Sequence, residues 1–188
     1  LYISPLKALA VDIERNLSAP VREMSLPVSI ETRTGDTPSH KRQRQKYAPP
    51  DILLTTPEQL ALLIASRDAE PFFRGLKFVV LDELHAMVTS KRGHLLSLGI
   101  ARLRRFAPDL QAIGLSATVA QPDELRKWLV AQNSRSEMAD LVTVRGGARP
   151  EITILKSAER IPWSGHSARY AMPEVYEAIK QHNTALLF

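Results

Sequence analysis

Short apolar runs alternate with amphipathic segments along the first two-thirds of the chain. The runs are rich in Val, Ile and Leu and lack strict polar alternation, which is typical of strands buried on both faces of a parallel sheet. This pattern predicts strands at residues 2–3, 28–30, 52–54, 78–81 and 112–115.

The segments between these runs carry apolar residues at helical spacing. Leu6, Leu9 and Ile13 recur in this way after Ser4 and Pro5, which together form a helix start signal. A capping-box pattern at residues 56–59 opens a second helix, and further helices are predicted at residues 93–106, 122–131 and 173–182. Strands that alternate with helices predict an α/β fold with a doubly wound parallel sheet and right-handed crossovers.

Each predicted strand leads into a loop of small or polar residues. These loops begin at Ser4, Glu31, Thr55, Asp82 and Ser116. Because the carboxyl ends of parallel strands share one rim of the sheet, we expect the five loops to form one composite binding surface.

Two adjacent carboxylates, Asp82 and Glu83, directly follow the buried strand at residues 78–81. One carboxylate at this position can hold Mg²⁺ through water while the other orients an attacking water, a division of roles suited to phosphoryl transfer. The pair therefore predicts a nucleotide-driven motor that uses ATP and Mg²⁺. The alternative is a helix N-cap pair, since Asp is common at that position.

Composition narrows the class of protein. The chain has 188 residues, 44% hydrophobic and 24% charged, which fits one domain and part of another. It has no cysteine, so disulfides, thiol catalysis and cysteine zinc sites are excluded, and a cytoplasmic location is compatible. The five histidines lack metal-ligand spacing, and no apolar run is long enough to span a bilayer.

The chain is basic, with a net charge of +5 and a pI near 9.7. Basic residues cluster at 41–46, 91–92 and 102–105. This distribution favours a polyanionic partner. The alternative is a set of solvated helix faces.

The character of the sequence changes after about residue 144. Residues 145–150 have the composition of a linker, residues 152–155 are predicted as a strand, and residues 185–188 as the start of another buried strand. Both ends of the chain lie inside predicted strands. We therefore expect an interior part of a larger protein, with one domain at residues 1–144 and, at residues 145–188, a linker and the beginning of a second domain.

Five short segments, in this order, resemble the motifs of superfamily 2 helicases of the DEAD/DEAH class. They are motif Ia (residues 4–9), motif Ib (34–37), motif Ic (55–58), motif II (82–85) and motif III (116–118). One such match is weak evidence, but five in order at strand ends are specific. The closer resemblance is to the Lhr (long helicase-related) group, in particular the bacterial ligase-associated DEXH-box helicases, through residues 31–37, 51–60, 80–85, 90–93 and 162–170.

This resemblance implies a RecA-like domain of the P-loop NTPase type and a catalytic role for motif II. Asp82 would be the Mg²⁺ partner and Glu83 would polarise the hydrolytic water. His85 would link the nucleotide site to motif III, in which Ser116 and Thr118 would relay the nucleotide state. The alternatives are a hydrogen-bonded core histidine and a turn cap made by the two hydroxyls.

The resemblance also implies that motifs Ia, Ib and Ic hold the phosphate backbone of a nucleic acid, a contact that is independent of sequence. The candidate residues are Ser4, Lys7, Arg33, Thr34, Gly35, Thr55 and Thr56. We expect Gly35 to allow close approach of the backbone or a positive φ. Arg92 and residues 41–46 add electrostatic attraction or form a solvated face, and Trp163 stacks on a base or packs between domains.

The P-loop pattern G-x-x-x-x-G-K-[ST] is absent, because no glycine in the chain is followed by Lys-Ser or Lys-Thr. We therefore expect this chain alone not to hydrolyse ATP, and a second RecA-like domain to supply an arginine finger. The resemblance also implies that the whole protein is an ATP-dependent helicase that moves 3′ to 5′ on single-stranded DNA in DNA repair. It further implies an ATP-dependent DNA ligase and a nuclease as partners. The alternatives are a related RNA helicase and a non-catalytic nucleic-acid-binding module.

Overall fold

The computed structural model describes residues 1–117, 119–132, 138–144, 151–155 and 168–187. The chain divides into two compact units, Leu1–Val142 and Thr143–Phe188. Each unit is described by itself.

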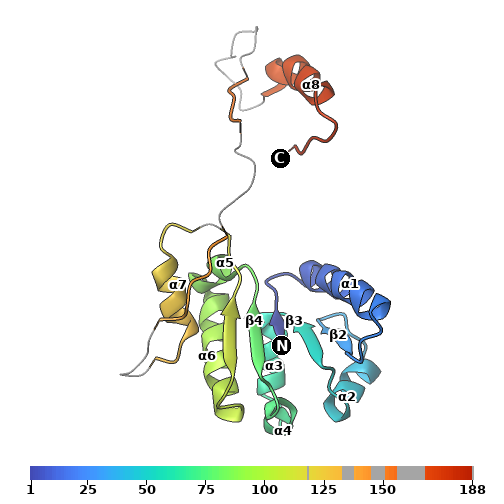
Figure 1. Ribbon diagram of the computed structural model, residues 1–188, viewed down its shortest axis with the longest axis vertical. Helices are drawn as coiled ribbons and strands as arrows, with labels where there is room; N and C mark the ends of the chain where they lie inside the picture. The colour runs from blue at the N-terminus through green and yellow to red at the C-terminus, as the bar shows by residue number, and fades with distance from the viewer. Residues whose placement is uncertain (118, 133–137, 145–150, 156–167, 188) are drawn as a thin grey trace. The chain divides into compact units, whose positions relative to one another are not determined.

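A five-stranded parallel sheet forms the centre of the first unit, with strand order β2-β3-β1-β4-β5 (Figure 1). The strands are β1 (Tyr2–Ile3), β2 (Ile30–Arg33), β3 (Ile52–Thr55), β4 (Phe78–Leu81) and β5 (Gln111–Gly114). All four strand pairs are parallel. The predicted doubly wound α/β fold is therefore confirmed.

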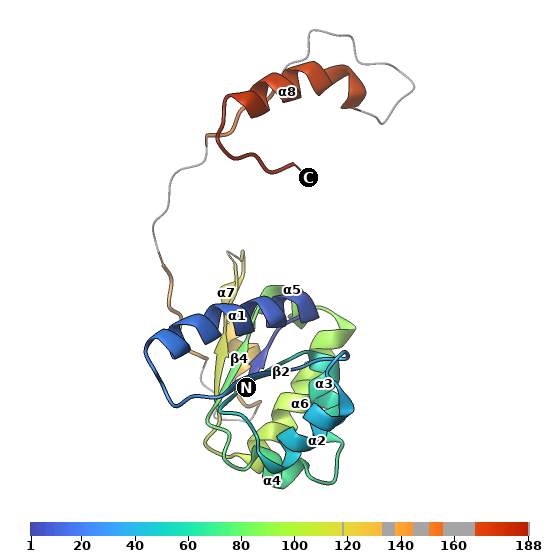
Figure 2. The same cartoon turned by 90° about the vertical axis from the view of Figure 1, so that its right-hand side faces the viewer.

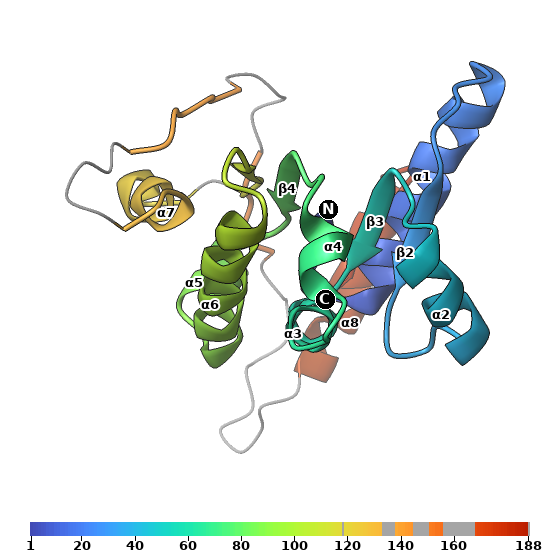
Figure 3. The ribbon, with the colours of Figure 1, turned by 90° about the horizontal axis from the view of Figure 1, so that it is seen from below.

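Helices cover both faces of this sheet. They are α1 (Lys7–Glu23), α2 (Ser39–Tyr47), α3 (Pro57–Ile64), α4 (Ala69–Phe73), α5 (Leu84–Val88), α6 (Lys91–Phe106) and α7 (Pro122–Leu129). Helix α1 packs over β2 and β3 on one face, while α3 and α6 pack side by side on the other (Figures 2 and 3). The connection from β1 to β2 runs along the sheet towards the β2 edge, whereas the later connections run towards the β5 edge. Because such connections are right-handed, α1 lies on the opposite face of the sheet from the helices of the later connections.

The main hydrophobic core lies between the sheet and the helices α3 and α6. Ile3, Val79 and Leu81 project from the strands and are fully buried, together with Leu60 of α3 and Leu103 of α6. Burying one such side chain contributes about 1.5–3 kcal/mol. This packing makes the strand ends a rigid platform for the loops that follow them.

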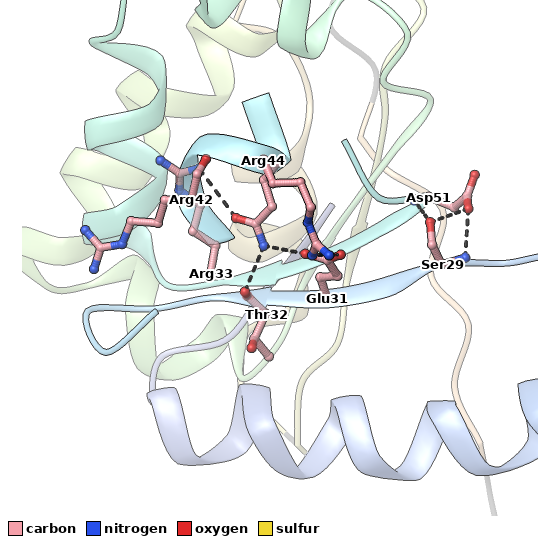
Figure 4. Close-up of polar contacts among 8 residues, drawn as sticks. Ser29, Glu31, Thr32, Arg33, Arg42, Arg44 and Asp51 are labelled. Carbon is pink, nitrogen blue, oxygen red and sulfur yellow. Dashed lines mark hydrogen bonds and ion pairs between the residues drawn. The ribbon is translucent and has the colours of Figure 1, made fainter. Parts of the chain in front are cut away.

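Strand β2 begins later than the sequence pattern predicts. The predicted bounds of this strand, residues 28–30, are wrong. Strand β2 covers residues 30–33 and includes polar residues that were expected in a loop. Both the backbone N–H and the hydroxyl of Ser29 donate to Asp51 Oδ2, at 2.8 and 2.6 Å, before the ladder with β3 starts (Figure 4). As an edge strand, β2 does not need the apolar composition of the central strands.

The second unit contains a 3₁₀ turn (Ala168–Ala171) followed by α8 (Met172–Lys180), close to the predicted helix. Residues 152–155 and 185–187 are not strands, so both predicted strands are wrong over the residues described. Ile152 and Leu186 are largely exposed, and an apolar run forms a strand only when it finds a paired neighbour. The predicted linker and Trp163 lie outside the described residues.

Within the described part of the chain, no helix is both long enough and apolar enough to cross a membrane.

Candidate active site and nucleic-acid interface

All five strands end at the same level of the sheet. Ile3 is in register with both Thr55 and Leu81, Arg33 is in register with Thr55, and Leu81 is in register with Gly114. The loops that follow the strands therefore leave from one rim, as the sequence predicts. Motifs II and III lie at the β4–β5 side of this rim, and motifs Ia, Ic and Ib lie at the β1–β3–β2 side.

The acidic pair leaves β4 in an unusual backbone conformation. Asp82 N donates to Ile3 O at 2.9 Å, and Asp82 Oδ1 accepts from Glu83 N at 3.0 Å. Glu83 has φ 48° and ψ 43°, in the left-handed region, which costs a residue other than glycine about 1–2 kcal/mol. Such strain is concentrated at functional sites.

Helix α5 starts directly after Glu83, which is its N-cap residue, but no side chain caps the helix. The capping alternative for the acidic pair therefore does not describe this junction. The Glu83 side chain is about half exposed at the rim. The Glu83 carboxylate and Asp82 Oδ2 therefore remain available for other chemistry, while Asp82 Oδ1 accepts the Glu83 N–H.

His85 joins motif II to motif III. Its Nδ1 lies 3.0 Å from Ser116 Oγ, and its Nε2 lies 3.5 Å from Glu83 Oε2. The backbone reinforces the connection, since Leu84 N donates to Leu115 O at 2.9 Å. The His85 side chain is one-third exposed, so it is not a buried core histidine. Thr118, the other predicted relay residue, lies outside the described residues.

Tyr2 is a further residue beside the acidic pair that the sequence analysis missed. It lies on β1 in register with Val80 of β4, the strand that leads into Asp82. Burial, with smaller contributions from the nearby Asp82 and Glu83 carboxylates, raises the pKa of Tyr2 to about 12. The phenol therefore stays protonated beside the acidic pair. An aromatic residue in a short apolar strand gave no signal for this role.

Motif Ia is tied to the other two motifs on its side of the rim. Ser4 is fully buried, and its N–H donates to Thr55 O at 3.0 Å. The buried Ser4 Oγ has no hydrogen-bond partner among the described residues. Lys7, in the first turn of α1, contacts Asp36 Oδ2 of motif Ib at 2.5 Å. Because both side chains of that pair are largely exposed, Lys7 remains accessible to a ligand.

Motif Ib is a compact turn. Thr34 N donates to Thr37 Oγ1 at 2.9 Å, and Thr37 N donates to Thr34 O at 3.2 Å. Gly35 has no positive φ, and a Cβ at this position would have no atom within 4 Å. Of the two alternatives expected for Gly35, the positive φ is therefore not found. The open space beside Gly35 is compatible with the close approach of a ligand.

Arg42 of α2 holds this turn from behind. Its Nε donates to Thr37 O at 2.7 Å, and its Nη2 donates to Gly35 O at 2.6 Å and Thr34 O at 3.2 Å. Three carbonyl groups of one loop are thus fixed by one guanidinium. In the sequence Arg42 is only part of a basic run, and nothing in that run distinguishes it from its neighbours.

Arg33, a predicted nucleic-acid contact, lies behind the rim. It is the last residue of β2 and is 9% exposed, and its Nη1 donates to Arg42 O at 3.1 Å (Figure 4). Burial, with a smaller contribution from the charge of Arg42, lowers its pKa. The fully buried Gln45 completes the cluster by donating to Glu31 Oε2 at 2.8 Å and Thr32 O at 3.1 Å. Arg33 therefore supports motif Ib from inside the domain.

Motif Ic is also largely engaged within the protein. The hydroxyl of Thr55 is buried and donates to Arg33 O at 2.7 Å. Thr56 is the N-cap residue of α3, but its side chain makes no capping bond, so the predicted capping box is not formed. Glu58 points to Arg92 instead, at 2.5 Å from its Nε. The basic segment at residues 91–92 is thus not simply a solvated face.

A hollow of about 430 Å³ lies between α1 and motif Ib. Charged and hydroxyl groups border it, and they belong to Lys7, Asp12, Thr32, Thr34, Asp36, Thr37 and Lys41. The lining thus includes Lys7 and Thr34, two of the residues predicted to hold a phosphate backbone.

The rim also offers a carboxylate for a metal ion. Within the described ranges, no group of three or more His, Cys, Asp or Glu side chains could hold a metal. Nucleotide-bound Mg²⁺ needs no such group, because it takes one or two carboxylates, substrate phosphates and several waters. Asp82, at the carboxyl end of β4, fits this requirement.

Comparisons with known proteins agree with this geometry. The family model of the DEAD/DEAH box helicases matches residues 1–125. The ATP-dependent helicase Lhr-Core of Methanocaldococcus jannaschii is 38% identical over the whole chain, which covers 23% of that relative. The Lhr helicase/uracil glycosylase of Escherichia coli is 39% identical over 86% of the chain, which corresponds to 10% of that relative. The chain spans about a quarter of the length of the Lhr-Core relatives.

Solved structures of helicases have the same fold. The Mycobacterium smegmatis helicase Lhr bound to single-stranded DNA and AMP-PNP matches 97% of the chain and 25% of its own length, with 32% identity and a TM-score of 0.69. The helicase MrfA bound to DNA and AMPPNP matches 68% of the chain and 19% of its own length, with 31% identity and a TM-score of 0.60. The five-stranded parallel sheet is thus a RecA-like helicase domain. The chain belongs to the DEAD/DEAH box helicase family, with the Lhr helicases among its relatives.

Proposed function

We propose that the protein carrying this chain is an ATP-dependent helicase or translocase that couples hydrolysis of Mg-ATP to movement along single-stranded nucleic acid. The observation that carries the proposal is the bridge from Glu83 through His85 to Ser116. It joins the acidic pair to motif III on the same rim that bears motifs Ia, Ib and Ic. This arrangement suits a motor, in which phosphoryl transfer must be linked to a second binding surface.

In this proposal, motif II performs the chemistry. Asp82 would hold Mg²⁺ through water, and the ion would neutralise charge on the phosphates. Glu83 accepts a proton from the attacking water as oxygen bonds to the γ-phosphorus and the bond to the leaving oxygen of ADP breaks. Tyr2, whose phenol stays neutral beside the acidic pair, would help to orient the Asp82 carboxylate. Positioning and charge stabilisation are what phosphoryl transfer requires of a protein.

The link between nucleotide and nucleic acid runs through motif III. A movement of Glu83 would shift the His85 ring through the contact at Nε2, and the ring would in turn shift Ser116 through the contact at Nδ1. We also assign Thr118 to this relay, by the family resemblance alone.

Motifs Ia, Ib and Ic would hold the phosphate backbone. Lys7 and Gly35 are exposed at the rim and supply one ammonium group and backbone N–H groups, which are suitable partners for a phosphate contact that carries no sequence information. Ser4, Thr34 and Thr56 belong to the same loops but are buried, and so are Arg33 and Thr55. These five residues would support the contact surface from within the domain.

We propose that residues 1–144 are part of the helicase ATP-binding domain, and that residues 145–188 are a linker and the beginning of a second RecA-like domain. A phosphate-binding P-loop and an arginine finger would complete the site in a protein of the length of the Lhr relatives. On this basis we expect no ATP turnover from the 188-residue chain alone.

Single-stranded DNA is the proposed track, and movement 3′ to 5′ in DNA repair is the proposed role. Two observations on relatives support DNA. One relative of known structure is bound to single-stranded DNA, and another carries the name of a uracil glycosylase. A DNA ligase and a nuclease as partners rest on the family resemblance alone, and a cytoplasmic location rests on the absence of cysteine. A related RNA helicase would differ in its response to the 2′-hydroxyl group.

The test is ATP hydrolysis by a chain extended to the length of the Lhr relatives, with and without single-stranded DNA or RNA, beside its Glu83→Gln variant. Turnover that is stimulated by DNA and lost in the variant would establish the motor. If the folded, extended protein binds DNA but never hydrolyses ATP, the proposal fails and a non-catalytic binding module is the better description.

A further inference from the structure

Arg92 connects two of the rim loops from a third element. It lies in the first turn of α6, and its Nε and Nη2 donate to the two oxygens of Glu58 at 2.5 and 3.1 Å. The same Nη2 donates to Pro5 O at 2.7 Å. One guanidinium therefore holds the carboxylate of motif Ic and a backbone carbonyl of motif Ia together.

The backbone that carries Arg92 is itself tightly fixed. Ser90 Oγ accepts from Gly93 N at 3.2 Å and donates to Met87 O at 2.7 Å. A Cβ at Gly93 would lie 2.2 Å from Met87 O, so only glycine lets the start of α6 approach the end of α5 this closely. Because α5 follows Glu83 directly, Arg92 is anchored to the segment that carries the acidic pair.

The ion pair with Arg92 lowers the pKa of Glu58. The hydrogen bond from Arg92 is the largest cause of a Glu58 pKa below its ordinary value of 4.5. Both side chains are nevertheless partly exposed, at 40% for Arg92 and 49% for Glu58. The pair thus mainly fixes the position of Glu58, because an arginine that donates two hydrogen bonds sets the orientation as well as the distance of a carboxylate.

We propose that Arg92 is a positioning residue that sets the spacing between motifs Ia and Ic, and so presents both to one nucleic-acid strand. The inference rests on the proposed function, since it assumes that these motifs bind nucleic acid. It differs from a direct electrostatic contact, in which Arg92 would itself bind a phosphate. Nε and Nη2 of the guanidinium are engaged by Glu58 and Pro5, so only Nη1 is left for a phosphate, and we assign the main contacts with the strand to the neighbouring loops.

The test measures binding of a fluorescent single-stranded DNA by fluorescence anisotropy, at several salt concentrations, in the chain extended to the length of the Lhr relatives. The variants are Arg92→Gln, Arg92→Lys, Glu58→Gln and the Arg92→Gln/Glu58→Gln double variant. We expect each single variant to weaken binding about five-fold, and the double variant to be no weaker than Arg92→Gln, since both changes remove the same pair. The slope of log affinity against log salt should not change.

Two further readouts separate positioning from a phosphate contact. Lysine keeps the charge but cannot form the fork, so Arg92→Lys should not restore binding. In ATP hydrolysis, the DNA concentration for half-maximal stimulation should rise in Arg92→Gln, while turnover at saturating DNA persists. Arg74→Gln is the matched control, because Arg74 forms a similar pair with Glu70 on α4, away from the rim.

Several outcomes would overturn the inference. The first is DNA binding by Arg92→Lys that equals the wild type. The second is a slope of log affinity against log salt that is reduced by about 0.7 in Arg92→Gln. The third is unchanged or tighter DNA binding by Glu58→Gln. An equal loss in Arg74→Gln would mean a general effect on folding. If Arg92→Gln does not fold, Glu58→Gln alone decides. A wild-type protein that does not bind DNA would instead sink the proposed function, and this inference with it.

Discussion

His85 Nδ1 and Ser116 Oγ lie 3.0 Å apart, although one residue follows β4 and the other follows β5. The same ring reaches Glu83 through its other nitrogen. A histidine between a carboxylate and a hydroxyl has both ring nitrogens engaged, so a change at either partner alters the ring's best position. The contact therefore joins the loop after β4, which carries the acidic pair, to the loop after β5.

Loss of this contact should uncouple ATP turnover from nucleic acid. We expect His85→Ala and Ser116→Ala each to lower the ratio of DNA-stimulated to unstimulated ATP hydrolysis about ten-fold, in the chain extended to the length of the Lhr relatives. The double variant should be no worse than His85→Ala, because both remove one contact. Additive losses in steady-state ATP hydrolysis would show that the two residues act separately.

Tyr2 should give the protein a distinctive response to alkaline pH. Its folded-state pKa of about 12 exceeds the ordinary value of 10.0, so the neutral phenol is favoured in the folded protein. The resulting stability is fully present below pH 10 and is lost as the pH rises towards 12. Denaturant unfolding of the wild type and of Tyr2→Phe at increasing pH will check this. The variant should lack that part of the decline, and parallel curves would contradict the assignment.

The pair between Arg92 and Glu58 should make stability sensitive to acid. Since the folded-state pKa of Glu58 lies below 4.5, the stabilisation is present above that pH and disappears as the pH falls through the lower value. In Glu58→Gln, the unfolding free energy should be lower at neutral pH and fall less on acidification. Equal acid dependence in the two proteins would argue against the pair in solution.

Two glycines offer a matched comparison of structural and functional roles. Gly93→Ala places a methyl group against Met87 O and should destabilise the fold by about 1–3 kcal/mol. Gly35→Ala meets open space and has no positive φ, so its unfolding free energy should change by less than about 0.5 kcal/mol. Thermal unfolding of both variants measures this difference.

Gly35→Ala also tests motif Ib. If the open space beside Gly35 receives a phosphate backbone, the variant should bind single-stranded DNA more weakly while remaining as stable as the wild type. Binding that equals the wild type would remove Gly35 from the proposed interface.

The sequence pattern predicts the central strands well because their burial requires continuous apolar residues. It fails at α2, where no apolar periodicity exists and Gln45 is buried through hydrogen bonds to Glu31 and Thr32. It likewise misplaces β2, whose edge position admits polar residues.

The position of the candidate site follows from the strand ends, and these are visible in the sequence. The supporting contacts are not, because they depend on how far long side chains reach between distant segments. Arg92 and Glu58 are far apart in the chain and belong to different helices. A basic residue in such a run carries no sign of the partner that folding will give it.

The central place of β1 in the sheet has a consequence for how the domain assembles. Tyr2 belongs to β1, yet its two neighbours in the ladder, Leu54 and Val80, come much later in the chain. During synthesis, β1 cannot form these two pairings until β3 and then β4 have emerged from the ribosome. Such distant pairing is slow compared with local contacts. The acidic pair therefore reaches its working position only when β4 pairs with a strand that was made well before it.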